Sequence, residues 1–158
     1  MPSIKERLLA RIRAEGPIPF EDFQAVSLYD PDGFFGGQAL RSQKAGDFLT
    51  SPEVSPLFGE TLAAFVRAEL DRLGGNRVVE IAGGSGSLLR PLLGELGDVE
   101  AWAVEASPAA RESLADVVGV ARVVASLDGL PEPIDGVVVA NELLDNFPVA
   151  LAIRDGEG

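Results

Sequence analysis

Hydrophobic and polar positions follow two different rhythms along the chain, and the change comes near residue 77. From there to residue 140, short apolar runs are separated by segments with helical spacing. The predicted strands cover 78–82, 100–105, 121–126 and 136–140, and the predicted helices between them cover about 87–96 and 107–117. This alternation predicts an α/β fold in which right-handed crossovers join the strands of a parallel sheet.

The first 76 residues have a helical rhythm instead. A capping-box pattern of Ser3 and Glu6 precedes a first helix, a second is predicted over about 19–29, and a third starts at Ser55 and Pro56 and stops at Gly74. The side chains expected to face inward are those of Phe20, Phe23 and Val26 in the second helix, and of Phe58, Leu62, Phe65 and Leu70 in the third. A long polar, glycine-rich stretch over about 30–52 separates these two helices, and loops of that length are usually functional or disordered.

Two parts therefore follow from the pattern: a helical N-terminal extension with a covering loop over 1–76, and the first part of a Rossmann-like domain over 77–158. In a doubly wound sheet the fourth strand would be interior, yet only the apolar stretch 149–153 follows it. We expect a sheet that is incomplete at its C-terminal side. An unpaired edge of this kind invites association, including the formation of a homo-oligomer.

Composition narrows the chemistry that is available to the chain. There is no cysteine and no histidine, so a cysteine nucleophile, a disulfide and the commonest metal ligand are excluded, and we expect no metal site. The formal net charge of −12 argues against a nucleic-acid partner and favours a cationic one. No apolar run approaches the ~20 residues of a membrane helix, and no apolar signal segment opens the chain. We therefore expect no membrane partner and a cytoplasmic location.

The segment with the clearest chemical meaning is the glycine-rich turn that begins with Glu80, between the first predicted strand and the helix after it. A strand, a glycine turn and a helix together bring backbone N–H groups close to a ligand. The nicotinamide pattern G-x-G-x-x-G fails here, because Leu89 stands where its last glycine would be. The methyltransferase pattern acid-x-Gly-x-Gly-x-Gly fits Glu80, Gly84 and Gly86 with one change, at Ala82. A glycine turn without any ligand remains an alternative.

Polar residues follow the later strands at the edge where the ligands of parallel sheets bind. Glu105 ends the second strand, about 20 residues after the glycine turn, where an acid can accept hydrogen bonds from ribose hydroxyls; the alternative is a surface acid that caps the next helix. Asp128 could meet an adenine amino group or simply belong to a turn. Asn141, Glu142 and Asp145 follow the fourth strand, and the two acids could hold a guanidinium, unless this is only a solvated loop.

Longer motifs carry a family resemblance over nearly the whole chain. The segments concerned are Gly16-Pro-Ile, Leu28-Tyr-Asp-Pro-Asp-Gly-Phe-Phe, Gly46-Asp-Phe-Leu-Thr-Ser-Pro-Glu-Val-Ser, Phe58-Gly-Glu, Glu80 to Leu88, Val104-Glu-Ala-Ser-Pro and Asn141-Glu-Leu-Leu-Asp-Asn-Phe-Pro-Val. With these segments the chain resembles the MidA-like methyltransferases, relatives of the mitochondrial complex I assembly methyltransferase. The resemblance implies a class I methyltransferase fold with a helical N-terminal extension, and S-adenosylmethionine as the cofactor. It also implies a protein substrate with a cationic side chain, such as arginine.

Roles for individual residues follow from that resemblance. Gly84 and Gly86 would admit the cofactor beside Ala82, Glu80 would orient the loop, and Glu105 would hold the ribose. Asp128 and Asn141 would complete the cofactor site, and the segment 47–51, with Thr50 and Ser51, would fold over it. Glu142 and Asp145 would be catalytic, drawing in and orienting the cationic nucleophile.

The sequence also departs from the family pattern. Ala82 stands where the family usually has glycine, Gly83 where it has proline, and Phe34 and Phe35 where it has tyrosines. The family proteins are also much longer. A non-catalytic module that keeps the fold and binds a partner protein is therefore an alternative function. A nicotinamide-dependent oxidoreductase is a weaker one, because the glycine spacing is wrong and neither His nor Cys is present.

Overall fold

A computed structural model of the chain describes residues 2–36, 50–154 and 156. The chain divides into two compact units, one formed by residues 1–37 with 144–158 and the other by residues 38–143. The boundary expected after residue 76 falls inside the second unit, between its last N-terminal helix and its first strand. We call the first of these the helical unit and the second the sheet unit.

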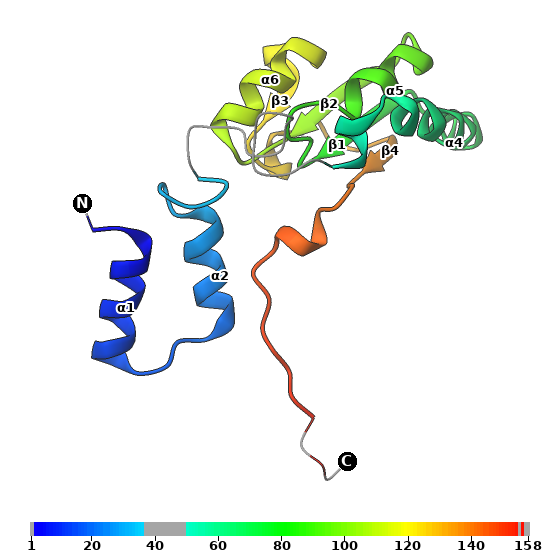
Figure 1. Cartoon of the computed structure of the whole chain (residues 1–158). Coiled ribbons are helices and arrows are strands. Elements are labelled where there is room, and N and C mark those ends of the chain that lie inside the picture. The colour runs from blue at the N-terminus through cyan, green and yellow to red at the C-terminus, as the bar shows by residue number, and fades with distance from the viewer. Residues whose placement is uncertain (1, 37–49, 155, 157–158) are drawn as a thin grey trace. The chain divides into compact units, whose positions relative to one another are not determined.

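The sheet unit is built on four parallel strands in the order β3-β2-β1-β4, as predicted for a Rossmann-like fold (Figure 1). Their bounds are β1 (Arg77–Ile81), β2 (Glu100–Val104), β3 (Val123–Val124) and β4 (Gly136–Val139). Strand β3 is shorter than the predicted 121–126 because the turns η1 (Val120–Arg122) and η2 (Leu127–Gly129) flank it. Within the described residues β4 pairs only with β1 and so forms an edge of the sheet.

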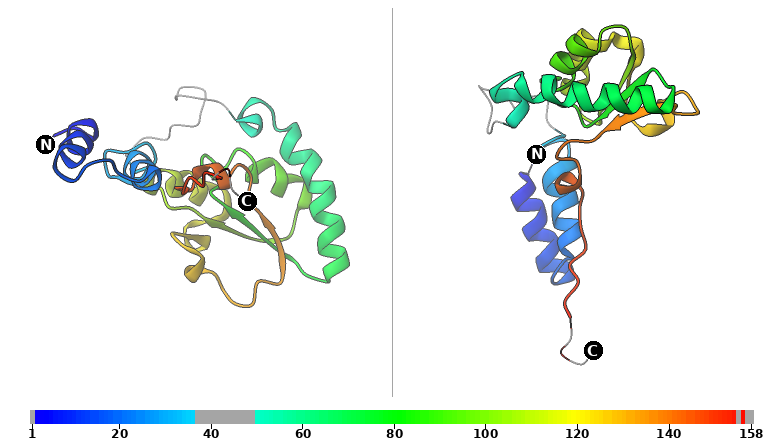
Figure 2. Two further views of the ribbon diagram at one scale, coloured as in Figure 1. Left: turned by 90° about the horizontal axis from the view of Figure 1, so that it is seen from below. Right: turned by 90° about the vertical axis from the view of Figure 1, so that its right-hand side faces the viewer.

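One face of this sheet is covered by α4 (Leu57–Leu73), α5 (Leu89–Leu96) and α6 (Pro108–Val118), as Figures 1 and 2 show. The buried core between helices and sheet consists of Ala63, Val66, Leu70, Val78, Leu89, Leu92, Leu96, Ala103 and Leu114. The opposite face carries a smaller cluster of Val79, Val104 and Leu130 with Ile81, Trp102 and Val124 around it. Because strand side chains alternate between faces, Val79 and its neighbour Val78 belong to different clusters.

Two of the core predictions for α4 are wrong. Phe58 and Phe65 are 40% and 62% exposed, whereas Leu62 is half-buried and Leu70 is buried as expected. The buried stripe instead runs through small residues, Gly59, Ala63 and Val66, before it reaches Leu70. The close approach of α4 to α5 explains why small side chains are buried there, because a Cβ at Gly59 would lie 2.6 Å from Pro91 Cγ and 2.9 Å from the Leu88 carbonyl oxygen. Phenylalanine side chains do not fit into so narrow an interface.

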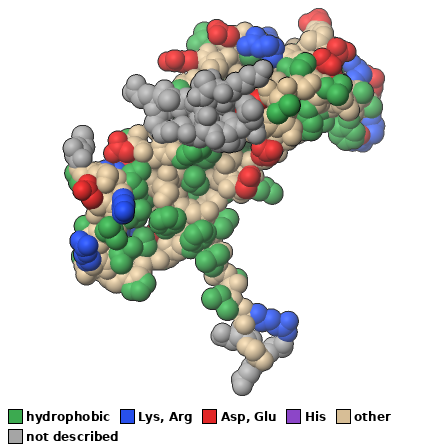
Figure 3. Space-filling model, viewed as in Figure 1, with side chains coloured by type: hydrophobic (Ala, Val, Ile, Leu, Met, Phe, Trp, Pro, Cys, Tyr) green, Lys and Arg blue, Asp and Glu red, His purple; other side chains and the backbone are tan. Residues whose placement is uncertain are grey.

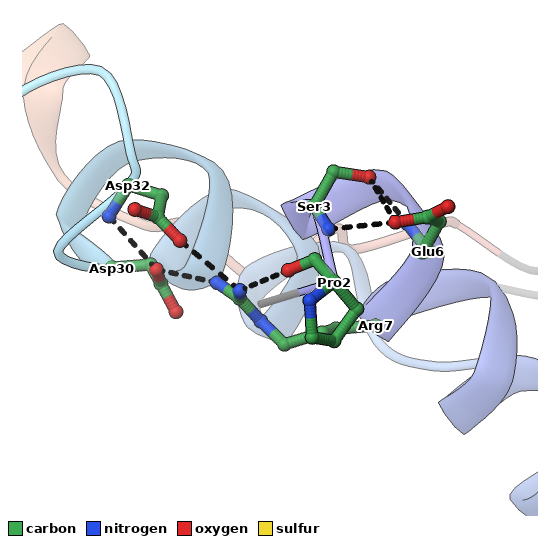
Figure 4. Close-up of polar contacts among 6 residues, drawn as sticks. All are labelled: Pro2, Ser3, Glu6, Arg7, Asp30 and Asp32. Atoms are coloured by element: carbon green, nitrogen blue, oxygen red, sulfur yellow. Dashed lines mark hydrogen bonds and ion pairs between the residues drawn. The ribbon is translucent and has the colours of Figure 1, made fainter.

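The helical unit pairs α1 (Ile4–Glu15) with α2 (Phe20–Tyr29). The predicted capping box is confirmed, with the Ser3 N–H donating to Glu6 Oε2 at 2.7 Å. Arg7 then joins the two ends of the pair: its guanidinium donates to Asp30 Oδ1 at 2.6 Å and to Asp32 Oδ2 at 3.1 Å, as well as to the Pro2 carbonyl (Figure 4). This network orients α1 against the turn that ends α2.

Residues from the end of the chain complete the helical unit. The Tyr29 hydroxyl donates to the Asn146 carbonyl oxygen at 2.7 Å, in the turn η3 (Leu144–Asn146), and the Val149 N–H donates to Gln24 Oε1 at 2.9 Å. The prediction that Phe20 and Phe23 face inward is wrong, since both are exposed, and Val26 is half-buried. Two helices can bury only one narrow strip between them, so hydrophobic side chains remain on the surface of this unit (Figure 3). None of the helices in the described residues is both long and apolar enough to span a membrane.

Candidate functional site

The glycine turn after β1 is a tight, backbone-stabilised loop. Gly84 and Gly86 adopt φ values of 54° and 77°, in the left-handed region that glycine enters without steric cost. The Gly86 N–H donates to the Gly83 carbonyl oxygen at 2.9 Å, and the Arg90 N–H in turn donates to the Gly86 carbonyl. A Cβ at Gly86 would lie 3.0 Å from Val117 Cγ2 in α6, so both conformation and space favour glycine at this position. We call residues 82–86 the glycine loop.

Glu105 binds this loop directly. Its carboxylate accepts a hydrogen bond from the Gly84 N–H at 3.1 Å and a second from the Ser107 N–H at 2.8 Å, just before α6 begins. The structure thus places Glu105 beside the glycine loop, and its predicted role toward a ribose stays a prediction. Each carboxylate oxygen has two lone pairs, so both can still accept hydrogen bonds from ribose hydroxyls. The alternative role, an acid that caps the helix after it, also fits, because Glu105 accepts the Ser107 N–H just before α6. Capping the helix and binding a ribose are compatible.

Glu80 is the most unusual ionisable group of the sheet unit. The residue is only 3% exposed, and its Oε2 atom has no hydrogen-bond partner among the described residues. Burial raises the pKa of Glu80 to about 8, and the nearby negative charge of Glu105 acts in the same direction. Gly83 lies directly over this carboxyl group, because a Cβ there would come within 2.5 Å of Glu80 Oε2. A buried carboxyl group with one unpartnered oxygen, beneath a loop of the kind that binds ligands, is typical of a functional site.

Ala82 is strained in the conformation that the loop requires. Its φ of 58° lies in the left-handed region, although its N–H makes a good bond to the Val104 carbonyl oxygen at 2.8 Å. For a residue with a Cβ, this region costs roughly 1–2 kcal/mol.

We therefore expect Ala82→Gly to raise the free energy of unfolding by about 1 kcal/mol, as measured by urea denaturation. The same change at Ala64, an exposed position within α4, should instead lower stability by a similar amount, since glycine weakens helices. Equal destabilisation by both substitutions would show that Ala82 is not strained.

Two residues of the site were not predicted, Glu53 and Ser85. The Ser85 hydroxyl donates to Glu53 Oε1 at 3.1 Å, and the Thr50 N–H donates to Glu53 Oε2 at 3.1 Å. Glu53 belongs to the short helix α3 (Ser51–Val54), where only loop was expected. The spacing Thr50-x-x-Glu53 is itself a capping-box signal and could have located this helix.

The remaining predicted residues are distributed over both units. Thr50 is half-buried just before α3, whereas Ser51, its first residue, is exposed; residues 47–49 of the proposed cover lie outside the described residues. Asp128 is exposed in η2, after β3, and Asn141 is half-buried after β4.

The two predicted catalytic acids belong to different units of the chain. Glu142 is exposed in the sheet unit with a φ of 54°, and Asp145 is exposed in η3, in the helical unit. A positive φ at a residue other than glycine is the kind of strain found at functional sites. No three acids of the described residues converge as a metal site would require.

The donors and acceptors of the glycine loop suit an adenosine-containing cofactor with a positive charge. Gly83 and Gly84 are half-buried and Gly86 is buried, and Glu105 at the end of β2 has lone pairs for a ribose. The carboxyl group of Glu80 lies beneath with one oxygen that has no partner among the described residues. Its pKa of about 8 keeps it protonated near neutral pH, and a cationic ligand beside it would favour the ionised form. Together with the strand order, these features define the class of Rossmann-like proteins that bind such a cofactor after β1.

Within that class, the chain belongs to the family described as "Putative S-adenosyl-L-methionine-dependent methyltransferase", whose model matches residues 59–158. The resemblance to MidA-like methyltransferases and the predicted fold class are thereby confirmed. A solved structure from Burkholderia thailandensis, described as a "COG1565 superfamily member and likely methyl transferase" bound to S-adenosyl-homocysteine, has a TM-score of 0.75 and 39% sequence identity. It is matched over 92% of this chain and 42% of its own.

Curated relatives match over shorter regions. The mitochondrial protein arginine methyltransferase NDUFAF7 of Danio rerio is 33% identical over 120 residues, which cover 67% of this chain and 28% of that protein. The NDUFAF7 homolog of Drosophila melanogaster is 33% identical over 95 residues, covering 58% of this chain and 22% of that protein. The chain thus spans about a quarter of the length of these curated relatives. The expected cytoplasmic location is contradicted, since these relatives are named as mitochondrial proteins.

Proposed function

We propose that this chain binds S-adenosylmethionine at the glycine loop and takes part in methyl transfer to a protein side chain, namely an arginine. The observation that carries the proposal is the position of Glu105, whose carboxylate is held between the Gly84 N–H and the Ser107 N–H at the end of β2. Support for the cofactor comes from the family and from the solved relative that holds S-adenosyl-homocysteine. Support for arginine comes from relatives that are named arginine methyltransferases.

The chain's own residues would have three tasks. The glycine loop binds the cofactor and Glu105 holds its ribose, while Glu80 presents a carboxyl group beneath the loop. The sulfonium of the bound cofactor supplies an electrophilic methyl group, so the protein contributes placement and electrostatics more than covalent chemistry. Glu142 of the sheet unit orients the guanidinium of the substrate through charge-assisted hydrogen bonds, which a carboxylate and a guanidinium form well, and Asp145 of the helical unit is a separate candidate for the same task.

Transfer of a labelled methyl group from S-adenosylmethionine to an arginine-containing peptide tests the proposal. We expect Glu142→Gln and Asp145→Asn each to lower the transfer rate about 10- to 150-fold, the equivalent of one hydrogen bond to a charged group. Neither variant should change the affinity for S-adenosyl-homocysteine, because the proposal gives these acids a role toward the substrate and none toward the cofactor. A peptide with lysine in place of arginine is the matched control and should accept less label.

The alternative function, a non-catalytic module that binds a partner protein, predicts a different result. The edge of the described sheet at β4 favours it, since an open edge can bind another chain. Cofactor binding without transfer to any protein from a cell extract would support that module and contradict the catalytic proposal.

A further inference from the structure

Glu53 of α3 contacts both the glycine loop and Thr50, the residue just before α3. One oxygen of its carboxylate accepts the Ser85 hydroxyl hydrogen and the other accepts the Thr50 N–H, each at 3.1 Å. Ser85 is flanked in the loop by Gly84, which Glu105 binds, and by Gly86. Two carboxylates therefore hold consecutive loop residues, Glu105 from the end of β2 and Glu53 from α3.

The contact of Glu53 with Ser85 is one of several between the segment around α3 and the segment that follows β1. Five residues after α3, Gly59 packs so closely on the start of α5 that a Cβ would meet the Leu88 carbonyl oxygen at 2.9 Å. The segment 50–59 thus lies along the segment 85–91, with Glu53–Ser85 at one end and Gly59–Leu88 at the other. A helix of only four residues has no independent stability, so α3 depends on such contacts for its orientation.

We propose that Glu53 is a positioning residue of the cofactor site: by binding Ser85 and Thr50 together, it couples the conformation of the glycine loop to that of α3. The inference rests on the proposed binding of the cofactor at this loop. Occupation of the loop then orders Thr50 and α3 at the same time, and loss of Glu53 loosens the loop as well as the helix. Glu53 itself touches neither the reacting atoms nor the substrate.

A double-mutant cycle tests the coupling. S-adenosyl-homocysteine is titrated calorimetrically into the wild-type chain and into Glu53→Ala, Ser85→Ala and the double variant, with the folded fraction of each confirmed by urea denaturation. We expect each single variant to bind about tenfold more weakly and the double variant to bind no more weakly than the singles, because both remove the same hydrogen bond. Glu60→Ala, an exposed acid in the first turn of α4, is the matched control and should bind like the wild type.

Hydrogen exchange provides a readout that a merely structural role would not move. S-adenosyl-homocysteine should slow exchange of the Glu53 and Val54 amides in the wild type, but not in Ser85→Ala, although the sequence of α3 is the same in that variant. Two results would overturn the role of Glu53 and leave the proposed function intact, provided that the wild type binds. In the first, the losses of binding free energy in the two single variants add up in the double variant; in the second, both single variants keep the wild-type affinity. Failure of the folded wild-type chain to bind at all would overturn both.

Discussion

The chain should lose stability as the pH rises from about 5 to 8, and Glu80 should account for most of the loss. Its carboxyl group has an ordinary pKa of 4.5 in the unfolded chain, and burial raises the pKa to about 8 in the folded protein. Between these values the folded state keeps a proton that the unfolded chain has released, so the free energy of unfolding falls with increasing pH. The contribution of the protonated Glu80 to the free energy of unfolding is fully present below pH 4.5 and is lost by about pH 8. Its upper limit is on the order of 5 kcal/mol.

Urea denaturation at about pH 5, 6, 7 and 8 measures this slope. Glu80→Gln cannot titrate, so its stability should change little over the same range. Glu100→Gln is the matched control. The Trp102 indole N–H and the Arg77 guanidinium, both bound to Glu100, hold the pKa of that carboxyl group below its usual range, so its titration lies at lower pH. If Glu80→Gln and the wild type declined in parallel, Glu80 would not be the buried acid described above.

Among the described glycines of the sheet unit, Gly136 should be the one whose change to alanine destabilises the chain most, by about 3 kcal/mol. Gly136 opens β4 opposite Arg77 of β1, and a Cβ there would lie 1.9 Å from the Arg77 carbonyl oxygen and 2.7 Å from its carbonyl carbon. Both are backbone atoms, so no side-chain rotation relieves the clash. Strand β4 would have to move away from β1, with loss of the hydrogen bonds between them.

Gly94→Ala provides the matched control for that substitution. Gly94 lies inside α5 and is exposed, and a Cβ added there would have no neighbouring atom within 4 Å. Alanine favours the helix over glycine by up to about 1 kcal/mol, so this variant should be more stable than the wild type in urea. A similar loss of stability in both variants would contradict the close contact between β4 and β1.

Local signals were sufficient to predict much of this fold. The capping box at Ser3, the helix stop at Gly74 and the apolar runs of β1, β2 and β4 are properties of adjacent residues, and all are present. The faces of the helices could not be predicted in the same way. In α4 the phenylalanine stripe and the small-residue stripe are offset by about one position, and only the distance to α5 decides which of them is buried.

The candidate site shows the same limit. The spacing between the glycine turn and Glu105 predicted an acid for a ribose, and parallel strands bring that acid to the loop, where it accepts the Gly84 N–H. The contact between Glu53 and Ser85 joins residues 32 positions apart, and no local pattern relates them. The burial of Glu80 likewise depends on how Gly83 packs over its carboxyl group. The roles of all these residues toward a ligand remain predictions.

The most direct test of cofactor binding at the glycine loop is a calorimetric titration of the chain with S-adenosyl-homocysteine, compared with the same titration of Glu105→Ala. We predict that the wild type binds and that the variant loses about 1.5–3 kcal/mol of binding free energy, the cost of hydrogen bonds to a charged group. Asp116→Ala, an exposed acid of α6, should bind as the wild type does. Equal affinity of Glu105→Ala and wild type, or no binding by the folded wild-type chain, would contradict the assignment of the glycine loop as a cofactor site.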